Sequence, residues 1–261
     1  MSARIIAIAN QKGGVAKTTS AITLAHVLAA RGVRVLMIDS DPQGSLSISS
    51  GLDQEQLTQL DRAGQTYFFA LVKKVTLDAI IVHREGKPDL IPASLSLTKA
   101  EQELQSPYGA AQTLRGLLAP IRERYDVILI DCPPSASVLT INALVAADGV
   151  LIPSKTDFLS MSGVTQTLEV IEEVRQQGNH ELSIIGILPT LYDARSSRHD
   201  GLILEQIRNV GASVGICVFE PINQSVSYKQ ASIEGESVLE YDARTPGIST
   251  YELIGQRIYA T

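Results

Sequence analysis

The fold is decided by residues 10–19, which read Asn10-Gln11-Lys12-Gly13-Gly14-Val15-Ala16-Lys17-Thr18-Thr19. A short apolar run at residues 4–9 precedes this stretch, and residues 18–30 follow with apolar side chains at three- and four-residue spacing. Glycines allow backbone N–H groups to converge on one point, and the start of a helix adds partial positive charge there. The stretch therefore predicts a phosphate-binding loop between a strand and a helix.

The loop also assigns chemistry to individual side chains. In such a loop Lys17 reaches the β- and γ-phosphates of a nucleotide, the Thr18 hydroxyl binds Mg²⁺, and Thr19 contacts the α-phosphate. The general pattern has glycine where this chain has Gln11 and Ala16. The Cβ of Ala16 narrows the backbone conformations open to the loop, which can alter its affinity for nucleotide.

Two other interpretations of the loop stay open. One is a glycine-rich turn that binds nothing. The other is a Rossmann dinucleotide site, with Asp39 as the acid that binds the ribose, although the Gly-x-Gly-x-x-Gly spacing is missing.

Strands and helices alternate outward from the loop. Short, nearly continuous apolar runs rich in β-branched residues occur at 4–9, 33–38, 126–131, 149–153, 182–188 and 215–219. Segments with helical spacing, such as 18–30 and 164–174, lie between them. This alternation predicts an α/β fold with a doubly wound, largely parallel sheet flanked by helices, as in P-loop NTPases, in one domain over 1–261. Ligands then bind at the carboxyl ends of the strands, after Ala9, Ile38, Ile130 and Leu188.

Composition limits the partners and the cellular compartment. The 261 residues include 22 Lys plus Arg against 28 Asp plus Glu, a net charge of −6, so nucleic acid or an anionic membrane can be bound only through a local basic patch. Cys132 and Cys217 lie far apart in apolar runs and predict neither a disulfide framework nor a metal site. No secretory signal and no apolar run of membrane-spanning length is visible, so we expect a soluble intracellular protein.

Residues 51–65 are polar and weakly patterned, so we expect this segment to lie at the surface as an excursion from the core.

Two carboxylates follow predicted strands at the same edge of the sheet as the loop. The segment Asp39-Ser40-Asp41-Pro42-Gln43-Gly44 comes after the second run, and Asp131 ends the apolar run at 126–131. A carboxylate at Asp39 can orient or deprotonate an attacking water and contact the Mg²⁺ shell, and Asp131 can hold Mg²⁺ directly or through water. Asp41 fits a turn or helix-cap acid equally well, and Asp131 can also simply cap a strand end.

These motifs together resemble the ParA family of deviant Walker-type P-loop ATPases, within the ParA/MinD superfamily. The resemblance lies in Lys12-Gly13-Gly14-x-x-Lys17-Thr18, in Asn10-Gln11 before it, and in the Asp-x-Asp-Pro-Gln element at 39–43. It continues through residues 190–195 and 235–246 and so covers essentially the whole chain. Its order and spacing are those of a short ParA protein without the additional N-terminal DNA-binding domain of larger relatives.

The resemblance implies a partner-stimulated ATPase that uses ATP and Mg²⁺ in a homodimer. In this family two subunits sandwich their nucleotides, and Lys12 crosses to the nucleotide of the partner; a solvated loop lysine is the alternative for Lys12. Residues 12–19 are then the ATP-binding loop, Lys12 and Asp39 the catalytic residues, and Thr18, Asp39 and Asp131 the Mg²⁺ site.

The resemblance also implies a task in the cytoplasm, on the nucleoid. ParA dimers bind DNA non-specifically, and a ParB-like partner bound to a plasmid or chromosome stimulates hydrolysis and releases them. Candidate DNA contacts are Arg195, which matches a DNA-contacting arginine of the family, together with Arg198 and Lys229; Arg208 lies nearby in sequence. The family usually has another arginine within 223–231, where only Lys229 remains. Arg195 and Arg198 can equally be solvated residues at the start of a helix.

Three alternative functions stay open. The cargo can be a protein body such as a carboxysome or chemotaxis cluster, recognised through a small adaptor. A MinD-like membrane ATPase needs a basic amphipathic C-terminal helix, whereas residues 251–261 have Arg257 as their only basic residue, so we expect no membrane binding. The third alternative is a switch that binds ATP and hardly hydrolyses it.

Overall fold

One six-stranded sheet forms the centre of the computed structural model, which describes residues 2–104, 107–193 and 198–259. Its strands are β1 (Arg4–Ile8), β2 (Val35–Asp39), β3 (Asp89–Ile91), β4 (Val127–Asp131), β5 (Gly149–Lys155) and β6 (Ser183–Thr190). Their order is β3-β2-β4-β1-β5-β6, and all neighbouring strands are parallel. The predicted doubly wound parallel sheet is confirmed.

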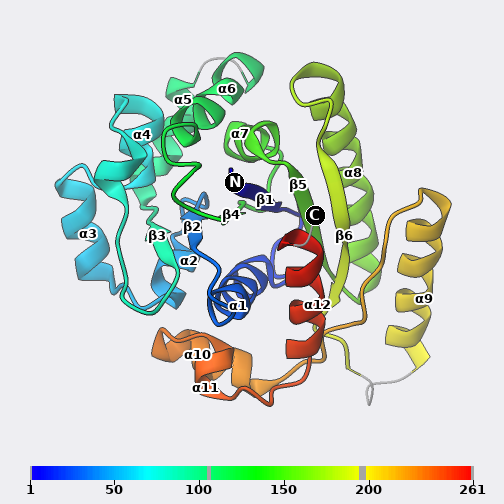
Figure 1. Cartoon of the computed structure of the whole chain (residues 1–261). Helices are drawn as coiled ribbons and strands as arrows, with labels where there is room; N and C mark the ends of the chain where they lie inside the picture. The colour runs from blue at the N-terminus through cyan, green and yellow to red at the C-terminus, as the bar shows by residue number, and fades with distance from the viewer. Residues whose placement is uncertain (1, 105–106, 194–197, 260–261) are drawn as a thin grey trace.

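Helices cover both faces of this sheet (Figure 1). The α-helices of the described residues are α1 (Lys17–Ala29), α2 (Ser45–Ser49), α3 (Gln54–Arg62), α4 (Tyr67–Lys73), α5 (Ala100–Glu103), α6 (Pro107–Leu118), α7 (Val138–Ala146), α8 (Phe158–Gln177), α9 (Arg198–Ser213), α10 (Val226–Glu234), α11 (Val238–Tyr241) and α12 (Ile248–Tyr259). Two 3₁₀ helices, η1 (Leu77–Ile80) and η2 (Leu95–Lys99), complete them. Side chains of α1 and α12 pack on one face, and those of α4, α7 and α8 pack on the other.

The central strands are apolar throughout because both of their faces are covered. In β1, Ile6 and Ile8 belong to the core on the α1 side, whereas Ile5 and Ala7 belong to the core on the α7 side. Successive side chains of a strand point to opposite faces, so a strand between two helical layers needs apolar residues at every position. This explains why the sequence shows continuous apolar runs in place of alternating ones.

The strand predicted at residues 215–219 is wrong. Val218 makes only an isolated parallel bridge to Ile187 in β6. The Phe219 N–H donates to the Ile187 carbonyl at 2.9 Å, and the next backbone bond joins the Ile222 N–H to the Pro189 carbonyl at 2.8 Å. Between these bonds the segment advances three residues and β6 only two, so the segment has one extra residue. Pro189 and Pro221 supply no N–H groups, and the ladder therefore cannot continue.

Two elements on the β2 side of the sheet were not predicted from sequence. β3 has three residues between Pro88 and Pro92, too few for a recognisable apolar run. The polar stretch 51–65 lies at the surface and contains α3, in which Leu57 is the buried residue. A capping box starts this helix: the Asp53 carboxylate accepts the Gln56 N–H at 2.7 Å, and the Gln56 side chain accepts the Asp53 N–H at 2.9 Å.

The C-terminal helix α12 turns its apolar side chains inward. Tyr251, Ile254 and Ile258 are buried in the core beside α1, and the Tyr251 hydroxyl lies 3.0 Å from that of Ser20. These apolar groups therefore stabilise the fold. Across the described ranges, no helix combines the length and the apolar character needed to cross a bilayer.

Candidate functional site

The loop between β1 and α1 is tied to three neighbouring elements. The Asn10 side-chain amide donates to a β5 carbonyl at 2.7 Å, and the Gln11 N–H donates to the Thr167 hydroxyl of α8 at 3.2 Å. At the end of β6, the Thr190 hydroxyl donates to the Val15 carbonyl at 3.1 Å. Hydrogen bonds with β5, α8 and β6 therefore hold the loop in place.

Two residues of the loop have left-handed backbone conformations. Gly14 has φ +72°, and Ala16, immediately before α1, has φ 60° and ψ 35°. A residue with a Cβ is strained by about 1–2 kcal/mol in this region, whereas glycine is not. Ala16 thus occupies the position where the general pattern has glycine and keeps a glycine-like conformation at some cost in stability.

Lys17 begins α1 with its amine buried beneath the loop. Its Nζ donates to the Lys12 carbonyl at 3.0 Å. Burial lowers the pKa of Lys17, and the negative charge of Asp131 acts in the opposite direction. A buried ammonium group bonded to a neutral carbonyl gains further from an anion held in the loop.

Asp131 presents a buried carboxylate that its surroundings satisfy only in part. Its Oδ2 accepts the Thr18 hydroxyl at 2.7 Å, whereas its Oδ1 is buried with no hydrogen-bond partner in the described part of the chain. Burial, followed by repulsion from Asp39, raises the pKa of Asp131 to about 8. An unpaired carboxylate oxygen beside a threonine hydroxyl fits a hard divalent cation such as Mg²⁺.

Asp39 lies beside Asp131 in the register of β2 and β4 and is fully buried. Its Oδ2 accepts the Ser47 N–H at 2.8 Å and the Ser47 hydroxyl at 2.6 Å, and its Oδ1 accepts the Asp41 N–H at 3.2 Å. Burial raises the pKa of Asp39 to about 7, and the Ser47 bonds oppose that rise. Two adjacent carboxylates with raised pKa values would both ionise readily beside a cation.

Asp41 stabilises a turn at the edge of the cavity. Its Oδ1 accepts the Gln43 N–H at 2.9 Å, which is a turn-stabilising bond, and the residue also lines the cavity described next. Over the described residues, no cluster of three or more His, Cys, Asp or Glu side chains is arranged to hold a metal. That is compatible with Mg²⁺, which is usually held by one or two carboxylates plus water and substrate oxygens.

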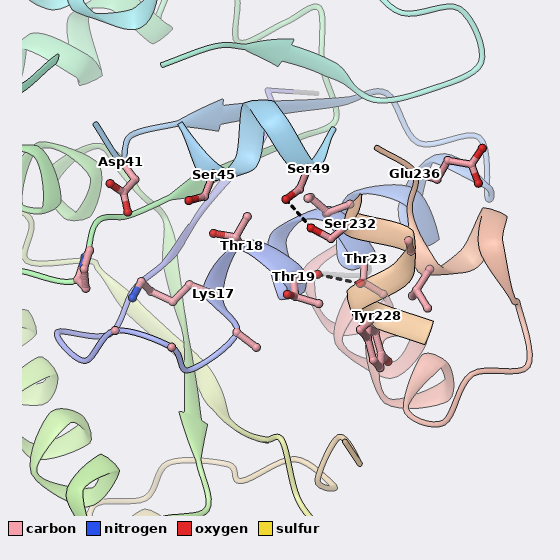
Figure 2. Close-up of a pocket in the computed structure, with 17 residues that line it drawn as sticks. Lys17, Thr18, Thr19, Thr23, Asp41, Ser45, Ser49, Tyr228, Ser232 and Glu236 are labelled. Carbon is pink, nitrogen blue, oxygen red and sulfur yellow. Dashed lines mark hydrogen bonds between the residues drawn. The ribbon is translucent and has the colours of Figure 1, made fainter. Parts of the chain in front are cut away.

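A cavity of about 310 Å³ is bordered by Lys17, Thr18 and Asp41 (Figure 2). Six of the predicted loop residues line one end of it: Gly13, Gly14, Ala16, Lys17, Thr18 and Thr19. The other end is lined from α2 and α10 by residues that no sequence motif had indicated, among them Ser45, Ser49, Tyr228 and Ser232. Glu236, from the stretch 235–246, also lines it. The Ser49 and Ser232 hydroxyls lie 2.7 Å apart and join the two walls. Val15, Asp39 and Asp131 are buried and do not line the cavity.

Lys12 lies outside the cavity lining and contacts its own chain. Its Nζ lies 2.7 Å from Asp157 Oδ1, in the connection between β5 and α8. Gly163 in α8 makes room for this part of the loop, because a Cβ there would lie 2.8 Å from Asn10 Oδ1 and 3.0 Å from Lys12 Cβ. Sequence reasoning missed Asp157 and Gly163 because neither stands in a recognised motif.

The candidate DNA contacts are only partly described. Arg195 lies outside the described residues, and Arg198 begins α9, but its side chain is also outside the description. Lys229 is exposed on α10. Arg208 is engaged by Glu220, with Nη2 and Oε1 3.2 Å apart.

Known sequences resemble this chain along almost its entire length. The family model of the AAA domain matches residues 3–184. The chain is 39% identical over 259 residues to the chromosome partitioning protein ParA of Caulobacter vibrioides, a match that covers 98% of this chain and 93% of that protein.

Solved structures resemble it to a similar extent. A complex of McdA from Cyanothece with ATP superposes with a TM-score of 0.87 at 25% identity, covering 99% of this chain and 97% of that one. A cobyrinic acid a,c-diamide synthase from Mycobacterium smegmatis, with an ATP analogue and magnesium bound, superposes with a TM-score of 0.77 at 35% identity. That match covers 94% of this chain and 98% of the other.

Proposed function

The chain belongs to the ParA family of P-loop ATPases, and from this premise we propose that it is a Mg²⁺-dependent ATPase that partitions a cargo as an ATP-bound dimer. One observation carries the proposal: Lys17 and Thr18 line one cavity, and the Thr18 hydroxyl donates to Asp131, whose other carboxylate oxygen is buried with no hydrogen-bond partner among the described residues. The ATP and magnesium in related structures support the same ligands here.

Each loop residue has a role in this proposal. Lys17 exchanges the Lys12 carbonyl for β- and γ-phosphate oxygens, the N–H groups of residues 13–16 bind phosphate oxygens, and Thr19 contacts the α-phosphate. Thr18 and Asp131 would hold Mg²⁺, with Asp39 at its hydration shell. Mg²⁺ supplies neutralisation of the charge that develops on the transferred phosphoryl group.

Asp39 acts on the attacking water. A buried carboxylate at this strand end can accept a hydrogen bond from water and orient it towards the γ-phosphorus. Because little covalent chemistry is required of the protein in phosphoryl transfer, this positioning accounts for much of the expected rate. We propose a slow basal rate that a partner protein stimulates.

Lys12 connects the site to dimerisation. Its role as the lysine that crosses to the partner's nucleotide requires its amine to leave Asp157, 2.7 Å away, for a phosphate group. Removing Lys12 should therefore weaken ATP-dependent dimerisation and preserve part of the nucleotide binding. Equal dimerisation of the wild type and Lys12→Ala in analytical ultracentrifugation with ATP would reject this role.

DNA is the proposed surface on which the dimer works, inside the cell on the nucleoid. Arg195, Arg198 and Lys229 are the proposed contacts with DNA phosphates. Three contacts per subunit predict a slope of log K against log salt of roughly −3 for a monomer and −5 for a dimer. The cargo-bound partner is a ParB-like protein, or a small adaptor if the cargo is a protein body.

The proposal is tested by phosphate release and by DNA binding. Wild-type protein should hydrolyse ATP only with Mg²⁺, and Lys17→Ala should not. The Asp39→Ala protein with ATP should bind random duplex DNA in a salt-sensitive manner, and a lack of such binding would reject the DNA role.

Turnover that survives Asp39→Ala would reject Asp39 as the hydrolytic residue. Binding of the protein to anionic liposomes would favour the MinD-like alternative. A wild type that binds ATP without turnover, even with DNA and partner present, would indicate the non-hydrolysing switch.

A further inference from the structure

Ser47 in α2 makes two hydrogen bonds to one oxygen of Asp39. Its hydroxyl donates to Asp39 Oδ2 at 2.6 Å, and its backbone N–H donates to the same oxygen at 2.8 Å. Both residues are 0% exposed. Bulk water therefore does not compete for either bond, and each is stronger than it would be at the surface.

The direction of the hydroxyl bond is determined by a third group. The Ala93 N–H, just after β3, donates to Ser47 Oγ at 3.1 Å. An N–H group can only donate, so the Ser47 oxygen accepts this bond and its own proton is directed to Asp39. The serine is thus anchored to the chain following β3 and in turn holds the carboxylate at the end of β2.

These bonds make the two oxygens of Asp39 unequal. Oδ2 accepts two short hydrogen bonds, whereas Oδ1 accepts one longer bond, from the Asp41 N–H at 3.2 Å. Fixing Oδ2 also limits rotation of the carboxylate about its last side-chain torsion, which is otherwise broad. Oδ1 is consequently the oxygen with capacity for a further donor.

Ser47 differs from its neighbours in α2. Ser45 and Ser49, two residues before and after it, line the cavity, and Ser47 does not. Ser47 is therefore placed to act on Asp39 and not on a ligand in the cavity.

We infer that Ser47 is a positioning residue for ATP hydrolysis, which holds Asp39 Oδ2 so that Oδ1 meets the attacking water. This inference rests on the proposed ATPase function. It assigns Ser47 an effect on turnover and none on nucleotide affinity, because its side chain contacts Asp39 and Ala93, and neither residue lines the cavity.

The experiment compares Ser47→Ala with Ser50→Ala under saturating Mg²⁺ and ATP. Ser50 is a matched control, since it is also buried at the end of α2 and its hydroxyl has no hydrogen-bond partner in the described ranges. Ser47→Ala should lower kcat by about 10- to 100-fold, with KM within twofold of the wild type, because a small misplacement of a reacting group costs rate. Ser50→Ala should leave both constants within twofold.

Ser47→Cys keeps a side chain of similar shape with a weaker donor and should give a kcat between those of wild type and Ser47→Ala. If circular dichroism shows that Ser47→Ala is unfolded, the kcat of Ser47→Cys is compared with that of the wild type in its place. A kcat within twofold of wild type in the folded Ser47 variants, or a KM that rises as kcat falls, overturns the inference. A wild type without Mg²⁺-dependent turnover would remove the proposed function as well, so the two failures are distinguishable.

Discussion

Helix α1 has a charged cluster at each end, and the two clusters differ in how fully the chain pairs their charges. The phosphate-loop cluster at its start consists of Lys17, Thr18, Asp39 and Asp131. The His26 cluster at its end consists of His26, Arg84, Lys87 and Glu240. Both are buried or partly buried, and both join α1 to distant parts of the sequence.

In the His26 cluster, the chain itself supplies partners for the charged groups. Glu240 accepts the Lys87 ammonium at 3.0 Å and the Ser237 N–H at 2.9 Å, and His26 Nδ1 lies 3.6 Å from it. Arg84 donates to the Ser50 carbonyl at 2.7 Å. Glu240, Lys87 and Arg84 each have a partner within the described part of the chain, which is typical of a structural network.

The phosphate-loop cluster, in contrast, is left open. One oxygen of Asp131 is unpaired within the described residues, and Asp39 and Asp131 repel each other. Burial of charge without full pairing destabilises the unliganded protein, and a ligand that completes the pairing recovers that energy. The comparison teaches that incomplete pairing, more than burial or charge alone, identifies the binding site.

The largest expected effect on ATP hydrolysis comes from replacing one lysine of each cluster by alanine. Lys17→Ala should reduce Mg²⁺-dependent phosphate release at least about 100-fold, because a positive charge next to the transferred group is lost from a water-poor site. Lys87→Ala should leave release within twofold. Comparable losses in both variants, measured at saturating ATP with folded protein, would break the distinction between the clusters.

Acid should weaken the protein through the His26 cluster. Burial lowers the pKa of His26 to about 4, whereas an unfolded histidine titrates near 6.5. Between these values the unfolded chain binds more protons, so the free energy of unfolding decreases as pH falls, by up to about 3 kcal/mol in total.

Urea unfolding at pH 7 and pH 5 measures this effect. His26→Asn should flatten the pH dependence, and His180→Asn, which alters an exposed histidine, should not. An unchanged slope in His26→Asn would show that the His26 cluster does not carry the acid sensitivity.

Binding of Mg²⁺ and ADP should supply partners to the phosphate-loop cluster and stabilise the folded protein. At 100 times its dissociation constant a ligand stabilises the folded state by about 2.7 kcal/mol, which corresponds to a rise in Tm of roughly 5–10 °C for a chain of this size. Asp131→Asn should lose most of this rise, and EDTA should have the same effect on the wild type. Thermal unfolding decides the matter, and a full rise in Asp131→Asn would exclude Asp131 from the Mg²⁺ site.

The smallest expected effect is on the free energy of unfolding and depends on the backbone conformation at the two ends of α1. Ala16 is left-handed with φ 60°, whereas Ala30 at the other end is right-handed with φ −61°. Ala16→Gly should therefore stabilise the unliganded protein by up to about 1 kcal/mol, and Ala30→Gly should destabilise it by about 0.5–1 kcal/mol. Changes of the same sign in chemical denaturation would argue against strain at Ala16.

Local sequence patterns were sufficient for the central part of the fold. The apolar runs of β1, β2, β4, β5 and β6 and the helical spacing of α1 are visible because a strand or helix covered on known faces needs a fixed periodicity. Asp39 and Asp131 could be placed together because parallel strands end at one edge of the sheet. The prediction failed at residues 215–219, because Pro189 opposite and Pro221 just after this segment donate no N–H and an extra residue shifts the register, despite the apolar composition.

The sequence by itself determined the α/β class, the loop at residues 10–19 and the family, since these depend on residues that are close in the chain. Only the tertiary structure decided that Ser47 would hold Asp39, that Asp157 would pair with Lys12, and that Ser49 would meet Ser232. Such contacts depend on how distant helices pack on the sheet. No local periodicity encodes that packing, because the same residues would satisfy their own segments equally well in another arrangement.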